Sequence, residues 1–192
     1  NHGGYTEKYD NFDEKVRLLG LNYPDINQYL SLVHESDSAL EYLISYFQNV
    51  DDPVEIVFFG DHQPSLSSSF YPNLNGKGLS GLTEDELEDL YTIPFFIWTN
   101  YESTEVELSI TSINYLSTLA LERAGIELPA YNQFLADMME TIPAINSRGY
   151  YSKSAGGFLH IEEATGEEAD WIRNYNILQY NNMFDKKEKS EV

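Results

Sequence analysis

Residues 54–64 of the chain read VEIVFFGDHQP, a short apolar run that ends in a glycine, a carboxylate and an imidazole. The six residues from Val54 to Phe59 are β-branched or aromatic with one exception, which is typical of an interior strand of an α/β sheet. Gly60 then permits the chain to turn. Because ligands of open α/β sheets bind beyond the carboxyl ends of strands, this run predicts a binding edge at Asp61 and His62.

The Asp61–His62 pair has two interpretations. A Gly-Asp turn after a strand is common, and its aspartate often only caps a following helix. A carboxylate oxygen beside a neutral imidazole is also the ligand mix expected for Mn²⁺, Zn²⁺ or similar ions, and not for Ca²⁺. The two side chains would supply only two ligands, however, where four or more are normal.

Several stretches carry a family resemblance. FFGDHQP at residues 58–64 resembles the metal-binding signature of the lipoteichoic acid synthase-like branch of the sulfatase and alkaline phosphatase superfamily, and NHGGY at residues 1–5 resembles the histidine motif that precedes it there. Two motifs in family order are more specific than either alone. The similarity continues through residues 91–98, 128–134 and 176–180, so it covers most of the chain.

The resemblance implies an α/β fold, namely the carboxyl-terminal portion of an alkaline-phosphatase-like sandwich, with a central sheet flanked by helices and a small terminal hairpin. It also implies that Asp61 and His62 bind a divalent metal, with Mn²⁺ first and Zn²⁺ or Mg²⁺ as alternatives, and that His2 contacts the substrate phosphate. The family often has proline where this chain has Gly4. Its other ligands, an acidic residue and a threonine nucleophile, lie upstream of the histidine motif, so no catalytic nucleophile is expected in this sequence.

By the same resemblance, the parent protein is expected to be a metal-dependent phosphoglycerol transferase in cell-envelope polymer synthesis. A threonine would attack a lipid-borne glycerophosphate, release diacylglycerol, and pass the glycerophosphate to a glycan or polymer hydroxyl. The parent is expected at the extracellular face of the membrane, anchored through its amino-terminal part. The 192-residue chain alone is expected to be soluble and inactive.

Two other functions stay open. A sulfatase or phosphodiesterase hydrolase of the same superfamily would use the same Asp61 and His62 with water as the acceptor. A noncatalytic glycan-binding module would instead use exposed tyrosines as its contact surface. Tyr175, Tyr180 and Phe184 could form such a surface, although their spacing is more typical of the buried stripe of a last helix.

Charge and composition exclude several classes of protein. The chain has 32 acidic and 11 basic residues, a formal net charge of −21, which would repel the phosphate backbone that dominates nucleic-acid affinity. Without cysteine it can form neither a disulfide nor a thiolate zinc site. No apolar run approaches the roughly 20 residues that cross a bilayer. At 42% hydrophobic content, residues 1–192 are predicted to fold as one unit.

The remaining pattern predicts the supporting elements. Thr83 and Glu86 match a capping box, so a short acidic helix should follow. His34 and His160 are expected to be solvated, not ligands. Apolar spacing predicts helices over residues 26–49, 112–124, 131–140 and 167–184, a second strand over residues 93–98 and a hairpin around Gly156. Turn-forming residues predict loops over most of residues 1–27 and over residues 65–81. The first helix is expected to cover a sheet in which the two strands are neighbours.

Overall fold

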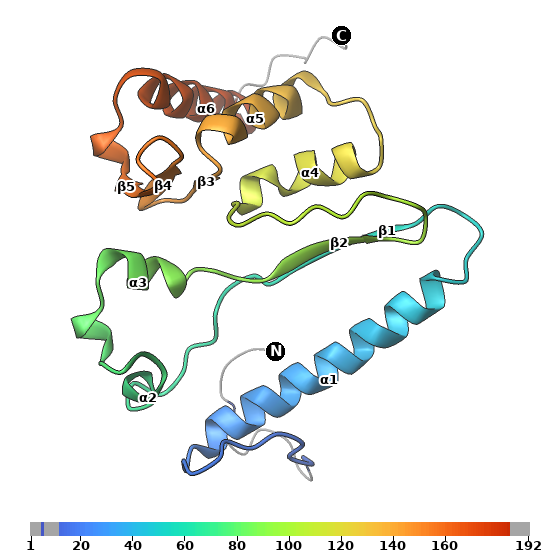
Figure 1. Ribbon diagram of the computed structural model, residues 1–192, viewed down its shortest axis with the longest axis vertical. Helices are drawn as coiled ribbons and strands as arrows, with labels where there is room; N and C mark the ends of the chain where they lie inside the picture. Colours follow the sequence, from blue (N-terminus) through green and yellow to red (C-terminus); the bar gives the residue numbers. More distant parts are fainter. Residues whose placement is uncertain (1–4, 6–11, 185–192) are drawn as a thin grey trace. The chain divides into compact units, whose positions relative to one another are not determined.

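The computed structural model describes residue 5 and residues 12–184, and the chain divides into two compact units, Asn1–Glu102 and Ser103–Val192 (Figure 1). The architecture is mixed α/β, with one small antiparallel sheet in each unit and helices beside it, which confirms the predicted fold class. That residues 1–192 act as one unit stays a prediction.

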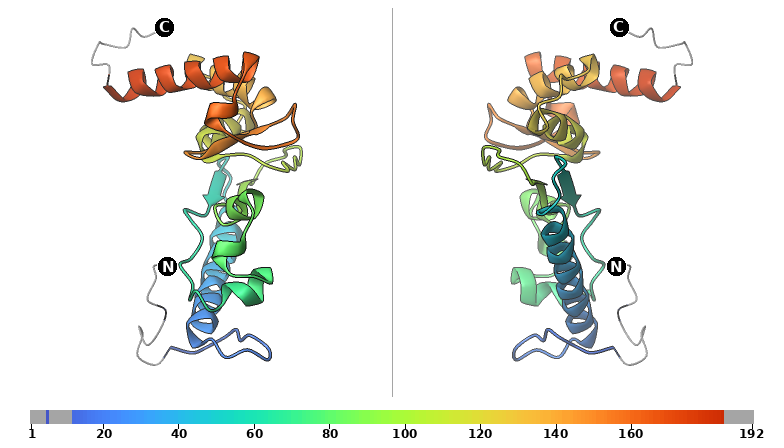
Figure 2. Two further views of the ribbon diagram at one scale, coloured as in Figure 1. Left: turned by 90° about the vertical axis from the view of Figure 1, so that its left-hand side faces the viewer. Right: turned by 90° about the vertical axis from the view of Figure 1, so that its right-hand side faces the viewer.

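In the first unit, residues 12–23 precede helix α1 (Pro24–Phe47) and make hydrogen bonds to it. Proline suits the first helical position, where its missing N–H would have no partner in any case. The backbone N–H groups of Lys15 and Val16 both donate to Oγ of Ser31, at 3.0 Å each, and Ser31 is fully buried. Figure 2 shows α1, in blue, as one continuous helix, so the predicted long helix is confirmed.

The organising strand β1 (Glu55–Phe59) pairs antiparallel with β2 (Phe95–Thr99), which confirms that the two apolar runs are neighbouring strands. Phe58 lies opposite Phe96, and their rings stack with centroids 5.2 Å apart. Within the described residues β1 has one partner strand, whereas the composition of an interior strand predicts two.

Helix α1 does not bury this sheet. No residue from position 32 to position 59 is buried, and Val33 and Leu43 on the apolar stripe of α1 are 43% and 40% exposed. The expectation that the long helix covers the two strands is therefore wrong for the described residues. The periodicity identified the helix correctly, but an apolar stripe does not say which surface it meets.

One side chain, Asn100, joins the end of α1 to the start of β1. Its Oδ1 accepts from the N–H of Val54 at 2.8 Å, and its Nδ2 donates to the carbonyls of Val50 and Asp52 at 2.9 Å each and of Phe47 at 3.2 Å. A single amide thus satisfies four backbone groups at the chain reversal.

The segment after β1 is more regular than its composition predicts. The loop expected over residues 65–81 contains α2 (Tyr71–Asn75) and a 3₁₀ turn, η1 (Leu79–Gly81). Gly76, with φ of 74°, ends α2 in the left-handed conformation that favours glycine. Helix α3 (Glu84–Asp89) begins with the predicted capping box, in which the N–H of Thr83 donates to Glu86 at 2.7 Å and the N–H of Glu86 donates back to Thr83 at 3.3 Å.

The second unit packs helices around a small three-stranded sheet. Its elements are η2 (Ile113–Tyr115), α4 (Leu116–Arg123), α5 (Ala130–Thr141), β3 (Ala144–Ile145), β4 (Gly149–Ser152), β5 (Gly157–His160), η3 (Ile161–Glu163) and α6 (Gly166–Phe184). The predicted helices and hairpin are therefore confirmed, with β3 as an additional strand. Tyr115, Leu135, Met138, Ile142 and Tyr150 form the centre of the core.

The hairpin is tied to α6 by Glu168. This carboxylate accepts from the hydroxyl groups of Tyr150 at 2.9 Å, Ser152 at 2.6 Å and Ser154 at 3.0 Å. Burial acts to raise the pKa of Glu168, but these hydrogen bonds outweigh it and hold the pKa below its usual value. In the part of the chain that the structure describes, no helix has both the length and the apolar content of a membrane span.

We expect Asn100→Asp to destabilise the first unit by about 1–3 kcal/mol, because a carboxylate cannot donate to the three carbonyls that the amide now satisfies. The matched control is Asn49→Asp, which removes one exposed hydrogen bond to Ser45 and should cost less than about 1 kcal/mol. Urea unfolding in a Trp171→Phe background lets Trp98 of the first unit report alone. Equal losses from both substitutions would contradict the role given to Asn100.

In the second unit, Gly149→Ala should lower the free energy of unfolding by about 1–3 kcal/mol, because the added Cβ would lie 2.1 Å from the backbone oxygen of Leu159 on the paired strand. Gly157→Ala, at the other end of the same strand pair, meets no atom within 4 Å and serves as the control. Urea unfolding followed by Trp171 fluorescence in a Trp98→Phe background measures both. A stable Gly149→Ala protein would show that β4 and β5 do not approach so closely.

Candidate functional site

The Asp61–His62 pair lies on the turn that follows β1, as the sequence predicts. Both side chains are exposed, by 76% and 64%, and Nε2 of His62 lies 3.4 Å from Oδ2 of Asp61. The N–H of His62 also donates to Oδ1 of Asp61 at 3.0 Å, which fixes the carboxylate beside the imidazole. The two side chains are therefore close enough to bind one ion.

The imidazole of His62 is set by its neighbour in the chain. Its Nδ1 lies 2.9 Å from the carbonyl oxygen of Gln63, and because a carbonyl can only accept, Nδ1 carries the hydrogen. In the neutral ring this leaves the lone pair on Nε2, the nitrogen that faces Asp61. A hydrogen bond from the second ring nitrogen to a carbonyl is the arrangement that orients metal-binding histidines.

The turn itself is held against the segment that leads into β2. The N–H of Gly60 donates to the carbonyl of Pro94 at 3.0 Å, and the side-chain amide of Gln63 donates to the carbonyl of Thr92. A Cβ at position 60 would lie 3.2 Å from Cβ of Ile93, a tight contact that glycine avoids. The site is thus positioned by backbone contacts on both sides of the Asp61–His62 pair.

Tyr5 is the residue of the amino-terminal motif that the structure describes. The tyrosine is buried, and its ring lies 5.3 Å from that of Tyr29 in α1. Burial raises the pKa of Tyr5, and the negative charge of Asp61 raises it further, so the two residues lie within electrostatic reach of each other. Sequence reasoning assigned Tyr5 no role of its own. His2, the predicted phosphate contact, lies outside the described residues.

The described residues supply a partial metal site. Nowhere among them do three or more His, Asp or Glu side chains gather in a way that could hold an ion, so Asp61 and His62 stand as a pair. His34 is exposed on α1, and His160 is exposed at the end of β5 in the second unit. Both are solvated, as expected.

A cavity of about 500 Å³ opens beside the turn. Gln63 and Pro64 form part of its wall, and the rest comes from the following loop, α2 and α3: Leu66, Tyr71, Leu74, Asn75, Glu86, Asp89 and Leu90. The sequence prediction treats this region as a loop and a solvated acidic face, and so misses the cavity. A proline at the start of α2 and Gly76 after it are the signals that could have identified the helix.

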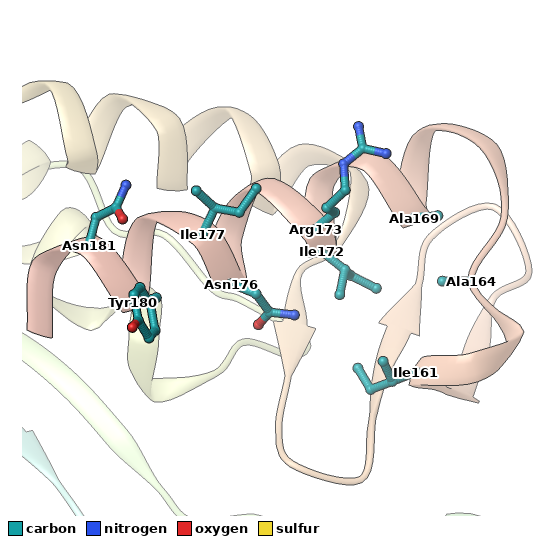
Figure 3. A pocket seen from close by; sticks show the side chains of 9 residues that line it. All are labelled: Ile161, Ala164, Ala169, Ile172, Arg173, Asn176, Ile177, Tyr180 and Asn181. Atoms are coloured by element: carbon teal, nitrogen blue, oxygen red, sulfur yellow. The ribbon is translucent and has the colours of Figure 1, made fainter. Parts of the chain in front are cut away.

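A second groove, of about 510 Å³, lies on the second unit between η3 and α6 (Figure 3). Ile172, Asn176 and Tyr180 follow one another along α6 and point to the same side of it. Tyr175 is buried, but Tyr180 and Phe184 are 65% and 59% exposed, with ring centroids 5.0 Å apart. The expectation of a buried stripe is right for Tyr175 and wrong for the other two, because α6 extends beyond the core that it covers.

Comparison with known proteins identifies the class. The sequence profile of the sulfatase family matches residues 1–126, which include the whole first unit and α4. The chain belongs to the sulfatase family.

Two similar proteins come from Rhizobium meliloti (strain 1021). A Rhizobium meliloti (strain 1021) protein named "Putative cyclic beta-1,2-glucan modification protein" is 25% identical over 85% of this chain and 26% of its own length. The capsular polysaccharide biosynthesis protein RkpI of the same organism is 44% identical over 35% of this chain and 11% of its own length. The chain thus spans about a quarter or less of these relatives.

A solved structure shares the fold. The Streptococcus pyogenes phosphoglycerol transferase GacH, in complex with sn-glycerol-1-phosphate, superposes with a TM-score of 0.60 at 16% identity. The match covers 82% of this chain and 34% of GacH. The described fold therefore corresponds to about one third of that enzyme.

Proposed function

We propose that this chain is the metal-binding part of a phosphoglycerol transferase that builds a cell-envelope polymer. The observation that carries the proposal is the Asp61–His62 pair: a carboxylate and a correctly oriented imidazole nitrogen lie 3.4 Å apart on an exposed turn after a strand. Membership of the sulfatase family and the fold shared with GacH support the reaction class.

Asp61 and His62 would hold the divalent metal, with Mn²⁺ as the first choice and Zn²⁺ or Mg²⁺ as alternatives. One carboxylate with one imidazole fits ions of this group better than it fits Ca²⁺. The bound ion would act as a Lewis acid on the phosphate oxygens of the substrate. Because two ligands leave an ion mostly hydrated, the remaining ligands are proposed to come from a part of the protein outside these 192 residues.

The proposed reaction has two displacements. A threonine oxygen, also outside these residues, forms a bond to the phosphorus of a lipid-borne glycerophosphate, and diacylglycerol leaves with the proton. An acceptor hydroxyl then forms its own bond to phosphorus, and the threonine recovers a proton as it leaves. His2, three residues before the buried Tyr5, is proposed to donate a hydrogen bond to the phosphate.

The acceptor and the location are part of the same proposal. The names of the two Rhizobium relatives refer to a glucan and to a capsular polysaccharide, and this supports a glycan hydroxyl as the acceptor. Such chemistry belongs at the extracellular face of the membrane, where the lipid donor and the polymer meet. A hydrolase of the same family would use the same Asp61–His62 pair with water in place of the glycan.

In the full-length protein, we expect Asp61→Ala and His62→Ala each to lower the turnover of a lipid phosphoglycerol substrate by on the order of 100-fold or more, because each removes a metal ligand. The 192-residue chain alone should release no diacylglycerol and should bind Mn²⁺ only weakly. Diacylglycerol release measures the first property, and calorimetric titration with Mn²⁺ measures the second.

The matched control is His34→Ala, which removes an exposed histidine from the middle of α1 in the same unit. Its turnover and Mn²⁺ affinity should equal those of the unmodified protein. Full turnover by either site variant, or turnover by the 192-residue chain alone, would show that the chemistry has been assigned to the wrong residues.

A further inference from the structure

We infer that the cavity beside the Asp61–His62 turn is an acceptor subsite that binds a neutral sugar unit of the acceptor glycan. This inference rests on the proposed function and deepens it, because it assigns a substrate class to a defined set of side chains. This cavity, of about 500 Å³, is open to solvent and lies between Gln63, Pro64, Leu66, α2 and α3.

The cavity lies directly beside the turn that carries His62. The carbonyl of Gln63 accepts from Nδ1 of His62, and the same residue lines the cavity. The side-chain amide of Gln63 donates to the carbonyl of Thr92. This hydrogen bond holds Gln63 in place, both in the turn and in the wall of the cavity. A molecule in the cavity would therefore lie next to the candidate metal ligands, where an acceptor hydroxyl has to be.

The lining of the cavity combines apolar and polar side chains. Four apolar residues line the cavity, namely Pro64, Leu66, Leu74 and Leu90, and its five polar residues are Gln63, Tyr71, Asn75, Glu86 and Asp89. Among the described residues, the side chains of Tyr71, Asn75 and Asp89 have no hydrogen-bond or ionic partner, although all three line the cavity. An apolar concavity of a few hundred Å³ with a few polar groups is the usual form of a small-molecule site.

The charge of the lining favours a neutral acceptor over a donor that carries a phosphate. Nζ of Lys77 lies 2.7 Å from Glu86, and hydrogen bonds from Lys77 and Thr83 lower the pKa of Glu86 to about 2. This ion pair occupies the ammonium group of Lys77, while the carboxylate of Asp89 has no ion-pair partner among the described residues. These acidic side chains disfavour a phosphate, but they can accept hydrogen bonds from sugar hydroxyls. The aromatic ring in the lining can pack against the C–H face of a sugar.

The position of Asp89 is also unfavourable for folding. It is the last residue of α3, where the partial negative charge of the helix end repels a carboxylate, and the last turn of α3 has no basic residue. Asp89 therefore does not stabilise α3 through its charge, and its carboxylate lines the cavity.

The test uses the full-length protein with a lipid phosphoglycerol donor and sophorose, the β-1,2-linked glucose disaccharide, as the acceptor probe. We expect Asp89→Asn, Tyr71→Phe and Asn75→Ala each to raise the acceptor KM by about tenfold or more. The donor KM and the slow release of diacylglycerol without sophorose should not change. Asp85→Asn makes the same charge change in α3 outside the cavity, and should behave like the unmodified protein.

The outcomes separate this inference from the proposed function. An unchanged acceptor KM in all three variants, a rise in the donor KM instead, or an equal effect of Asp85→Asn would overturn the acceptor subsite while leaving the transferase intact. No lipid turnover by the unmodified protein would contradict the proposed function. In that case NMR titration with sophorose tests the cavity directly: resonances near Tyr71 and Asp89 that shift in the unmodified protein but not in Asp89→Asn support a sugar site, and no shift overturns it.

Discussion

The hydrogen bond from the N–H of Gly60 to the carbonyl of Pro94 fixes the point at which the chain leaves the β1–β2 sheet. Every feature of the candidate site depends on that exit. The Asp61–His62 pair follows immediately, the carbonyl of Gln63 sets the tautomer of His62, and the side chain of Gln63 anchors the turn to Thr92. The turn is therefore held by hydrogen bonds to backbone carbonyls, and these do not require Asp61 and His62 to be buried. Both side chains can be positioned while exposed, without the free-energy cost of desolvation.

Different interactions stabilise the two units. In the second unit a cluster of fully buried side chains, with Tyr115, Met138 and Tyr150 at its centre, provides the hydrophobic stabilisation. In the first unit, where Tyr5, Ile26 and Phe70 are the buried hydrophobic residues that the structure describes, polar side chains join segments that are distant in sequence. Asn100 satisfies four backbone groups, and the hydroxyl of Tyr23 donates to the carbonyl of Ser69 at 2.9 Å. The stability of such a unit is sensitive to the loss of single hydrogen bonds, because each polar group left without a partner lowers the free energy of unfolding.

Much of the fold could be predicted because its signals are local. The capping box at Thr83 and the glycine that ends α4 are encoded within a few residues, and the structure follows both closely. The Asp61–His62 pair was predictable as a pair on one turn because the two residues are adjacent in sequence. Their role as ligands came from resemblance, and it stays a proposal.

What could not be predicted depends on contacts between distant residues. The apolar stripe of α1 indicates a helix but does not identify its neighbour, so the expected cover over β1 was wrong. The cavity beside the turn is assembled from a loop and two short helices, and none of these segments shows by itself that Tyr71 and Asp89 line one space. Tyr180 looks like a core residue by spacing, but it lies on a part of α6 beyond the core.

The most direct test of the central claim is an anomalous diffraction map at the manganese edge, from crystals of the full-length protein grown with Mn²⁺. We expect one strong peak within bonding distance of a carboxylate oxygen of Asp61 and of Nε2 of His62. Nδ1 of His62 should still donate its hydrogen bond to the carbonyl of Gln63. A manganese peak held by other residues, or one bonded through Nδ1 of His62, would contradict this expectation.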